Sequence, residues 1–500
     1  MSPTLLLGVI LAYFGILLGV ARYASRGASA DSFFHGNKNS NWVVVAFGMI
    51  GTSLSGVTFV SVPGLVGDTG FFYFQVLIGQ FIGYLVVAYV LLPVFYRHQL
   101  TSIYAYLGTR LGPNSRLAGA WLFLVSRSIG ASARLYLVII ILQVSLFDRL
   151  GLSYWFTAAA TVSLIVAYTF QGGVKAIIWT DLLQTVLMLT GLVVCSLYLA
   201  DALQLSLPAS YARMEAAGLS AIWSSDTDSV YFWGKQVLAG MLISVAMTGM
   251  DQEMMQKNIS VKSLGDSQKN IVTLAVVMLF VVFAFLFLGG LLSMFAQQNQ
   301  IAAVGDRLFP DVIFNHMPQA LQIVFVVALI SALFPSADGA LTALTASYCI
   351  DIARIDQRAD GGQPWSERRR LVFRRKVQIA FALLIFVLLA LLKIIDSASI
   401  VGLILKLATI TYGPLLGLFC FAIATRRVLD DRHVLWVVLA APLVCLALDL
   451  AQPYLFAEYR IGLEMLAING LLTLMGLLAI SAPPPQQTPT QPPASTGVPA

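Results

Sequence analysis

Long apolar stretches dominate the chain, and short polar stretches separate them. Thirteen such stretches are readable, with ends placed to within about four residues, at 4–22, 42–64, 74–96, 118–146, 154–170, 176–200, 231–250, 267–295, 319–349, 375–394, 399–424, 433–451 and 459–481. A helix needs about 20 apolar residues to cross a bilayer, and these stretches are close to that length or longer. The pattern therefore predicts an all-α polytopic membrane protein with thirteen transmembrane helices.

The composition agrees with this interpretation and excludes a soluble enzyme. Of the 500 residues, 58% are apolar and 11% are charged, whereas soluble domains are about 25% charged. No C-x-x-C spacing indicates a redox or zinc motif among the four cysteines, Cys195, Cys349, Cys420 and Cys445. The net charge of +6 comes from basic residues spread over short loops. This spread is typical of membrane proteins and indicates no nucleic-acid partner.

The distribution of lysine and arginine predicts an orientation. If the N-terminus lies outside, the cytoplasmic loops hold twenty-one of these residues and the outer loops hold six. Because basic residues favour cytoplasmic loops, we expect a multi-pass protein of the inner (plasma) membrane, with its N-terminus outside and its C-terminus in the cytoplasm. No basic residue precedes the first apolar stretch, which argues against a signal peptide. Residues 482–500 are rich in proline and glutamine and are expected to form a disordered cytoplasmic tail.

Two apolar stretches are interrupted by small and polar residues. Between Gly48 and Thr58 the second stretch carries three glycines and four hydroxyl groups in eleven residues. The seventh stretch carries Gly240, Ser244, Thr248 and Gly249. Glycine-interrupted helices at corresponding positions of two halves indicate a transporter binding site. Close packing of helices through small residues is the alternative, and it carries equal weight for the seventh stretch.

Asp181 lies inside the sixth apolar stretch, and Asp338 lies inside the ninth. A carboxylate within a bilayer is costly unless it is paired, so both are functional candidates. Carboxylate and hydroxyl oxygens suit hard cations rather than zinc or copper. The alternatives are that Asp181 lies near a helix end and that Asp338 forms an internal salt bridge, with three candidate partners: Arg127, Arg134 and Lys406.

Arg127 and Arg134 are seven residues apart in the fourth stretch, so they share one helix face about 10 Å apart. Either guanidinium could hold a carboxylate-bearing ligand through two parallel hydrogen bonds, or it could neutralise a buried aspartate. Lys406 is favoured to extend its ammonium toward the membrane surface. The four histidines fall in loops and form no cluster, so metal catalysis is not indicated: His35, His98, His316 and His433.

Several motifs resemble the sodium:solute symporter family, which includes bacterial sodium-coupled sugar, proline and sialic-acid transporters. The most specific is GGVKAIIWTD at 172–181, followed by Gln184, which resembles the family signature G-G-x-x-A-x-x-W-T-D-x-x-Q. Three further motifs are similar to family blocks: Gly51 to Gly64, Asp251-Gln252 with Gln256-Lys257, and Tyr412 to Gly417. The resemblance covers about residues 4–481.

The resemblance implies one transmembrane symporter domain, residues 1–481, built as a five-plus-five inverted repeat. The repeat halves are about 42–200 and 231–424, and the first and sixth core helices are broken. It implies a sodium site formed by the carbonyls of Gly51, Leu54 and Ala332 and the hydroxyl of Ser336. Pro335 departs from the serine usual in the family. The resemblance also implies a second ion position, formed by Asp181, Asp338 and Gly339. At position 338 an aspartate stands here in place of the hydroxyl residue of the family.

The resemblance also implies solute contacts, at Ser55, Thr58, Gln75, Arg127, Arg134 and Ser244. Serine and threonine beside an arginine favour a carboxylate-bearing solute. The resulting prediction is a secondary active symporter that imports a small organic solute with sodium by alternating access, and not an enzyme. Two alternatives remain: a proton-coupled symporter with Asp338 or Asp181 as the carrier, and a membrane sensor that uses the same fold.

Overall fold

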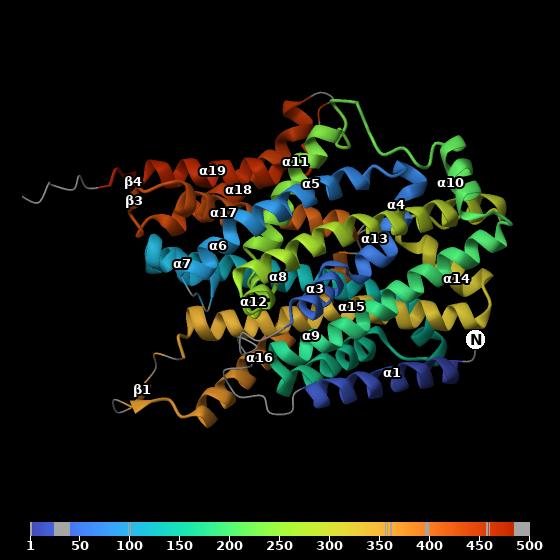
Figure 1. Cartoon of the computed structure of the whole chain (residues 1–500), viewed down its shortest axis with the longest axis horizontal. Helices are drawn as coiled ribbons and strands as arrows, with labels where there is room; N and C mark the ends of the chain where they lie inside the picture. The colour runs from blue at the N-terminus through green and yellow to red at the C-terminus, as the bar shows by residue number, and fades with distance from the viewer. Residues whose placement is uncertain are drawn as a thin grey trace, which may run out of the picture.

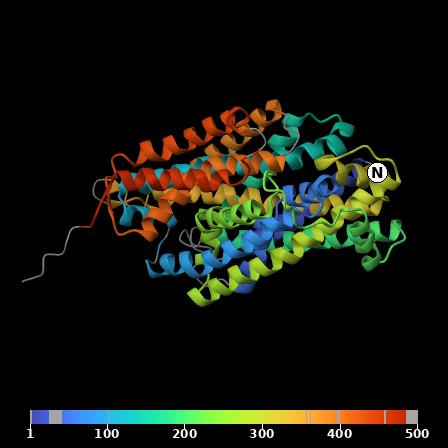
Figure 2. The same cartoon turned by 90° about the horizontal axis from the view of Figure 1, so that it is seen from above.

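The chain folds into a bundle of helices that mostly run along one common direction (Figure 1), and a view turned by 90° shows the same alignment (Figure 2). The structure is a computed structural model. It describes residues 3–24, 41–98, 100, 102–355, 357, 359–360, 363–395, 400–456, 459 and 461–484. Within these ranges it describes only the backbone of residues 171–176, which include the two glycines of the 172–181 motif.

The helices of the apolar stretches are α1 (Pro3–Ala24), α3 (Trp42–Ser53), α4 (Gly56–Thr69), α5 (Tyr73–Val86), η2 (Val87–Leu91), α6 (Leu92–Arg97), α8 (Pro113–Leu142), η3 (Gln143–Phe147), α9 (Tyr154–Ala202), α11 (Trp233–Ser244), η5 (Val245–Gly249), α13 (Leu264–Gln298), α15 (Gln319–Ser347), η7 (Tyr348–Ile352), α16 (Glu367–Ile395), α17 (Ile400–Ala424), α18 (Val434–Leu455) and α19 (Met465–Ala479). Shorter elements connect them: α7 (Ile103–Arg110), η4 (Asp148–Leu150), α10 (Leu207–Ala216), α12 (Gln252–Ile259), η6 (Gly305–Arg307), α14 (Leu308–His316) and strands β1 (Ala359–Asp360), β2 (Gln363–Pro364), β3 (Val428–Leu429) and β4 (Ser481–Ala482).

Every predicted apolar stretch is helical, but not every helix is long enough to span a membrane alone. Among the described residues, nine helices are long and apolar enough, or ten if the bent pair α3–α4 is one span. The remaining three stretches correspond to α11 with its π-helical continuation, to α19, and to Tyr154–Phe170 in the first part of α9. The fifth and sixth stretches both lie in α9, which is assigned without a break. The count of thirteen spans therefore stays a prediction.

The two ends of the described chain lie at opposite ends of the bundle. The start of α1 is at one end, whereas β3 and β4 lie at the other (Figure 1). These two strands pair antiparallel, with Val428 opposite Ala482 and Leu429 opposite Ser481. Ala482 is therefore part of a strand, which corrects its assignment to a disordered tail; residues 485–500 lie outside the described residues. β1 and β2 form a second antiparallel pair, with Ala359 opposite Pro364.

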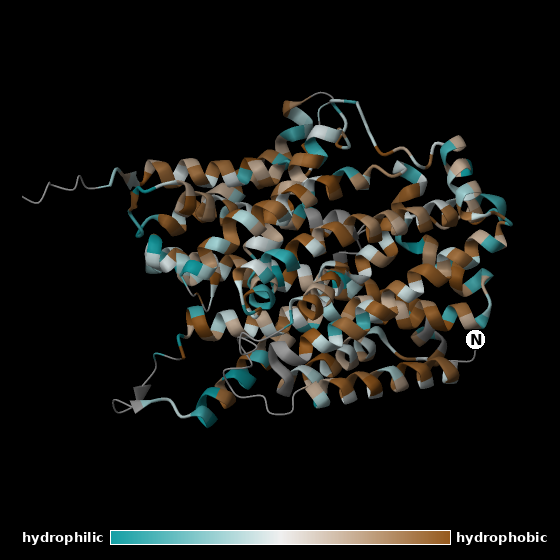
Figure 3. Cartoon of the chain, in the orientation of Figure 1, coloured by the Kyte–Doolittle hydropathy of each residue, from teal (hydrophilic) through white to brown (hydrophobic). Residues whose placement is uncertain are grey.

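Apolar residues cover the length of the helices, and polar residues gather at the two ends and around α12 inside the bundle (Figure 3). The outer helices expose large apolar side chains, such as Leu443 and Leu450 on α18, at 65% and 68%. A bilayer would cover such side chains. The interior is different because all eight residues of the polar helix α12 are buried.

The predicted break in the second apolar stretch is confirmed. α3 ends at Ser53, and α4 begins at Gly56 after a bend of 57°. Leu54 and Ser55 between them are extended, with ψ of 113° and 171°. The backbone N–H of Ser55 donates to the hydroxyl of Thr58 at 3.4 Å instead of continuing the helix. The break therefore frees carbonyl groups at the end of α3.

The seventh stretch is also interrupted, but at a different place from the one the sequence predicts. α11 ends at Ser244 and continues directly as the π-helical η5. The region from Ser244 to Gly249, where the glycine and hydroxyl residues predict a break, is therefore helical. The chain is extended only at Asp251, which caps the N-terminus of α12. α11 packs mainly against α5, and it is α12 that contacts α3. The two interrupted stretches thus meet through α12 and not through Ser244–Gly249.

Close packing explains the glycines of the α5–α11 pair. A methyl group at Gly240 would collide with the backbone carbonyl of Val76, and one at Gly79 would collide with the carbonyl of Val237. The two helices therefore cross backbone to backbone, as small residues permit in membranes. For Gly240 the packing alternative is correct.

We expect Gly240→Ala to lower the melting temperature of the detergent-purified protein. The added methyl group overpacks the α5–α11 contact, at a cost of about 1–3 kcal/mol. Gly15→Ala is the matched control, because nothing lies within 4 Å of a methyl group at Gly15 on α1. Equal melting temperatures for the two variants would contradict the close crossing.

Candidate solute and ion site

A cavity of about 130 Å³ lies beside the break between α3 and α4. Its wall comes from α3, α4, α5, α8, α11, η5, α12, α13 and α17. The polar residues that line it are Thr52, Ser53, Ser55, Thr58, Tyr73, Gln80, Tyr84, Arg127, Arg134, Ser244 and Thr248. This volume exceeds by several-fold what one water molecule needs, so the cavity has room for a small solute.

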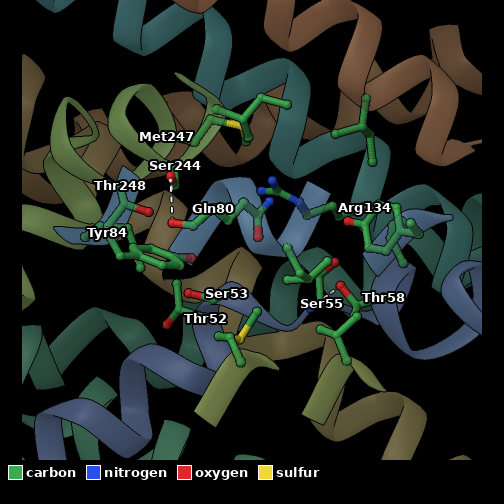
Figure 4. A pocket seen from close by; sticks show the side chains of 18 of the residues that line it. Thr52, Ser53, Ser55, Thr58, Gln80, Tyr84, Arg134, Ser244, Met247 and Thr248 are labelled. Atoms are coloured by element: carbon green, nitrogen blue, oxygen red, sulfur yellow. Dashed lines mark hydrogen bonds between the residues drawn. The ribbon is translucent and has the colours of Figure 1, made fainter. Parts of the chain in front are cut away.

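Hydroxyl groups and one amide line opposite sides of the cavity. Ser55 and Thr58 come from the broken segment, and Gln80 comes from α5 (Figure 4). The hydroxyl of Ser244 donates to the backbone carbonyl of Gln80 at 3.1 Å, which fixes α11 to α5 at the cavity wall. The side chains of Gln80 and Arg134 extend toward each other across the cavity (Figure 4).

The two arginines of α8 have different environments. Arg127 is 4% exposed; its Nη2 donates to Glu253, and its Nη1 lies 3.8 Å from Asp251. Arg134 lines the cavity and forms no ion pair or hydrogen bond with any residue that the structure describes. Arg127 is therefore already neutralised, and Arg134 is the cation that faces the solute space.

Gln75, a predicted solute contact, is not among the residues that line this cavity. Gln75 is buried, and its amide donates to the carbonyls of Phe72 and Tyr231 at 3.1 and 3.2 Å. It therefore holds the start of α5 against the segment before α11. Gln80, five residues further along the same helix, lines the cavity in its place.

α12 carries a run of buried charged residues beneath the cavity. Asp251 caps the helix by accepting hydrogen bonds from the N–H groups of Glu253 and Met254 at 2.9 and 3.3 Å. The hydroxyl of Tyr412 on α17 donates to the same aspartate at 3.0 Å. Since a bilayer offers no water to solvate them, such groups require partners inside the protein.

Lys257 at the other end of α12 joins three helices. Its ammonium lies 2.8 Å from Asp181 on α9, 2.5 Å from the hydroxyl of Thr52 on α3, and 3.4 Å from Glu253. Two glycines let α3 approach α9 at this point. A methyl group at Gly48 would lie 3.6 Å from the Cβ of Asp181, and one at Gly51 would collide with Thr185. Asp181 is thus a buried ion-pair partner and does not lie at a helix end.

Asp338 on α15 is buried and is held by hydrogen bonds from α9 and from its own helix. One carboxylate oxygen accepts a hydrogen bond from the hydroxyl of Tyr168 at 2.7 Å, and the other accepts one from the N–H of Gly339 at 2.5 Å. Gly339 leaves room for the side chain of Glu253, because a methyl group there would collide with it. A residue with a side chain at position 339 would therefore displace the carboxylate of Glu253.

The alternative for Asp338, a salt bridge to Arg127, Arg134 or Lys406, is not found in the described part of the chain. Arg127 pairs with Glu253, and Arg134 faces the cavity. Lys406 pairs with Asp449 at 2.7 Å, with its side chain 58% exposed, which agrees with the favoured interpretation of that lysine. Four carboxylates and two paired cations are therefore buried together around α12: Asp181, Asp251, Glu253 and Asp338 with Arg127 and Lys257.

The broken segment lies against α15 where the sequence places the sodium ligands. A methyl group at Gly56 would lie 4.0 Å from the Cα of Leu333, so Ala332 and Ser336 are within a turn of this contact. The hydroxyl of Ser336 donates to the carbonyl of Leu333 at 2.9 Å, which leaves its lone pairs available for a cation. Pro335 cannot donate to the carbonyl of Ser331, which adds a free carbonyl on this helix.

Comparisons with known proteins agree with the fold. Residues 33–435 match the family model described as the sodium:solute symporter family. The chain belongs to this family. It is therefore a sodium-coupled membrane transporter of a small solute and not an enzyme.

The relatives named here are similar over nearly their whole length. The sodium/sialic acid symporter NanT of Aliivibrio fischeri is 25% identical, over 93% of this chain and 92% of that protein. The sodium/sialic acid symporter SiaT of Proteus mirabilis is 22% identical, over 93% and 94%. A solved structure of a sodium-coupled sialic acid symporter in a substrate-bound outward-open state superposes with a TM-score of 0.80 at 19% identity, covering 95% and 97%. That likeness shows the shared fold.

Among the residues of this site that sequence reasoning missed are Gln80, Tyr168, Glu253 and Lys257. A signal existed for two of them, because Glu253 and Lys257 lie within the motif at 251–257 that resembles a family block. Their spacing of four residues places both on one face of a helix. The residues that this face contacts lie on α3, α8, α9 and α15. No local pattern indicates which of them pair with Glu253 and Lys257.

We expect Glu253→Gln to lower the melting temperature of the purified protein strongly. Removing one partner of a buried ion pair costs about 3–5 kcal/mol, because Arg127 is left without its nearest carboxylate. Lys269→Met is the matched control, since Lys269 forms an exposed ion pair with Asp266 and such pairs contribute about 0–1 kcal/mol. If both variants lose the same stability, the ion pairs of α12 do not stabilise the fold as described.

Proposed function

We propose that the chain imports a small carboxylate-bearing, hydroxyl-rich solute together with sodium, and that the solute has the chemistry of a sialic acid. The observation that carries this proposal is Arg134, a cation without an ion-pair partner in the described residues, which faces a cavity lined by hydroxyl groups. Its guanidinium can hold a carboxylate through two parallel hydrogen bonds. Ser55, Thr58 and Gln80 supply donors and acceptors for hydroxyl groups of the solute.

The names of the relatives support this solute class. Both full-length bacterial relatives are sodium/sialic acid symporters, and another relative, 26% identical over 79% of this chain, is the sodium-coupled monocarboxylate transporter 1 of Mus musculus. All three names describe sodium coupling and carboxylate-bearing solutes. They favour sodium over a proton as the coupling ion, and transport over sensing.

Sodium binds, in this proposal, between the broken segment and α15. The carbonyls of Gly51, Leu54 and Ala332 and the hydroxyl of Ser336 form the site. The break frees carbonyls at the end of α3, and the contact of Gly56 with Leu333 brings α15 beside them. Asp338 supplies negative charge nearby through the buried cluster around α12. The binding of a cation there would offset the excess of carboxylates over paired cations.

The topology in this proposal is thirteen spans, with the N-terminus outside and the five-plus-five inverted repeat at 42–200 and 231–424. The start of α1 and strand β4 lie at opposite ends of the bundle, so the chain must cross the membrane an odd number of times. This supports thirteen spans (Figure 1). Each proposed half contains one interruption, at Leu54 in the first and at Asp251 in the second.

Ion pairs and hydrogen bonds link helices at the end of the bundle that is cytoplasmic in this orientation. Arg116 on α8 pairs with Asp351 on η7 at 2.9 Å, and the hydroxyl of Tyr104 on α7 donates to the carbonyl of Met250 at 3.0 Å. Arg110, also on α7, donates to the carbonyl of Thr425 at 2.5 Å.

We expect Arg134→Ala to raise the half-saturation concentration for a sialic acid by roughly 10- to 150-fold in proteoliposomes. Loss of a charge-assisted hydrogen bond costs about 1.5–3 kcal/mol. The control is competition by a neutral sugar of similar size, whose weak inhibition should change little. A similar loss for both compounds would indicate that Arg134 has a structural role.

We expect Ser336→Ala to raise the sodium concentration for half-maximal uptake by about tenfold, since the loss of one oxygen ligand worth about 1.4 kcal/mol has that effect. Thr345→Val is the matched control on the same helix, because that hydroxyl donates to the carbonyl of Leu341 at 2.7 Å, away from the proposed site. An unchanged sodium dependence for Ser336→Ala would place the ion elsewhere.

A further inference from the structure

We propose that the ammonium of Lys257 is a tethered cation that fills the second cation position at Asp181, so that one sodium ion, and not two, accompanies each solute. This inference rests on the proposed function, which places sodium at Ser336 and Ala332. It identifies the residue of this chain that sets the ion count.

The position around the Lys257 ammonium is built for a hard cation. Three oxygen atoms surround it, one from the hydroxyl of Thr52, one from Asp181 and one from Glu253, at 2.5, 2.8 and 3.4 Å. These side chains are buried, with exposed fractions of 6%, 0% and 2%. A set of hydroxyl and carboxylate oxygens is the set that hard cations such as sodium prefer.

The three helices that supply the oxygens are held close together. Gly48 and Gly51 let α3 lie against α9 beside Asp181, and the hydroxyl of Thr52 also donates to this aspartate at 3.3 Å. Glu253 is fixed by its ion pair with Arg127. The oxygens therefore keep their places independently of Lys257, and the position would persist if the ammonium were removed.

Asp181 retains capacity for a cation. Its Oδ2 accepts from Lys257 and Thr52, whereas its Oδ1 is buried and has no hydrogen-bond partner among the described residues. Without Lys257 this carboxylate would be buried and unpaired, which is unfavourable in a medium of low dielectric. A sodium ion that took the place of the ammonium would restore the charge balance.

Lys257 excludes a second sodium ion while it is present. Two cations within a few ångströms repel each other, and the repulsion is strong where water is absent. The ammonium is covalently held, so it cannot leave with the solute. The site between α3 and α15, in contrast, has no lysine or arginine among its proposed ligands and stays available for the transported ion.

The experiment measures equilibrium binding of radioactive sodium alone to the full-length, detergent-purified protein. We expect one bound sodium ion per wild-type chain. Lys257→Ala should bind two, and the double variant Lys257→Ala, Asp181→Ala should again bind one. Lys257→Arg is the matched control, which keeps a tethered positive charge and should bind one. Size-exclusion profiles and melting temperatures verify that each variant is folded.

A second variant keeps the proposal testable if Lys257→Ala does not fold. Asp181→Asn removes the carboxylate but leaves the ammonium in place. If Lys257 fills the position, Asp181→Asn should leave the sodium count at one and the affinity within about twofold. A loss of bound sodium in this variant would show that Asp181 ligates sodium in the wild type, and would overturn the proposal.

The outcomes separate this inference from the proposed function. A wild-type chain that binds two sodium ions, or a folded Lys257→Ala variant that still binds one, overturns the inference alone. A wild-type chain that binds no sodium and shows no sodium-driven uptake overturns the proposed function as well.

Discussion

The absence of water within a membrane is the constraint on which this structure depends. The charged helix α12 lies in the interior, so each of its ionisable side chains needs a partner from another helix. Arg127 of α8 meets Glu253, Tyr412 of α17 meets Asp251, and Asp181 of α9 meets Lys257. These contacts tie α12 to the helices that surround it. The same contacts place an excess of carboxylates beneath the cavity, where a transported cation is needed.

Alternating access would have to change these contacts without leaving charges unpaired. The ion pairs at α12 and the hydrogen bonds of α7 to Met250 and Thr425 connect parts of the bundle that flank the cavity. A buried charge that loses its partner costs several kcal/mol. Sodium and an anionic solute bring charges that could compensate such losses. Binding of sodium and solute together should therefore favour the conformational change more than binding of sodium or solute alone.

Local features of the sequence were sufficient for the helices and for the first break. Gly51 to Thr58 cannot form a good helix, since glycine is permissive and serine and threonine compete for backbone hydrogen bonds. The structure breaks there, at Leu54 and Ser55. In the seventh stretch the same residue types gave a misleading signal, because Gly240 serves close packing with α5 and the interruption comes later, at Asp251. Gln75 and Gln80 illustrate a related difficulty, because only the surroundings of α5 decide which amide faces the cavity.

Hydropathy and short motifs are properties of neighbouring residues, so the membrane environment, the helices and the family could be predicted from the sequence. The sequence also singled out Asp181, Asp338 and the two arginines of α8 as unusual, since charge is costly within a bilayer wherever it lies. Which charged residues form ion pairs with each other depends on the tertiary structure. Lys257 and Asp181 are 76 residues apart, and Arg127 and Glu253 are 126 apart. Such pairs form where helices cross, and the crossing depends on the packing of the whole bundle rather than on any segment of the chain.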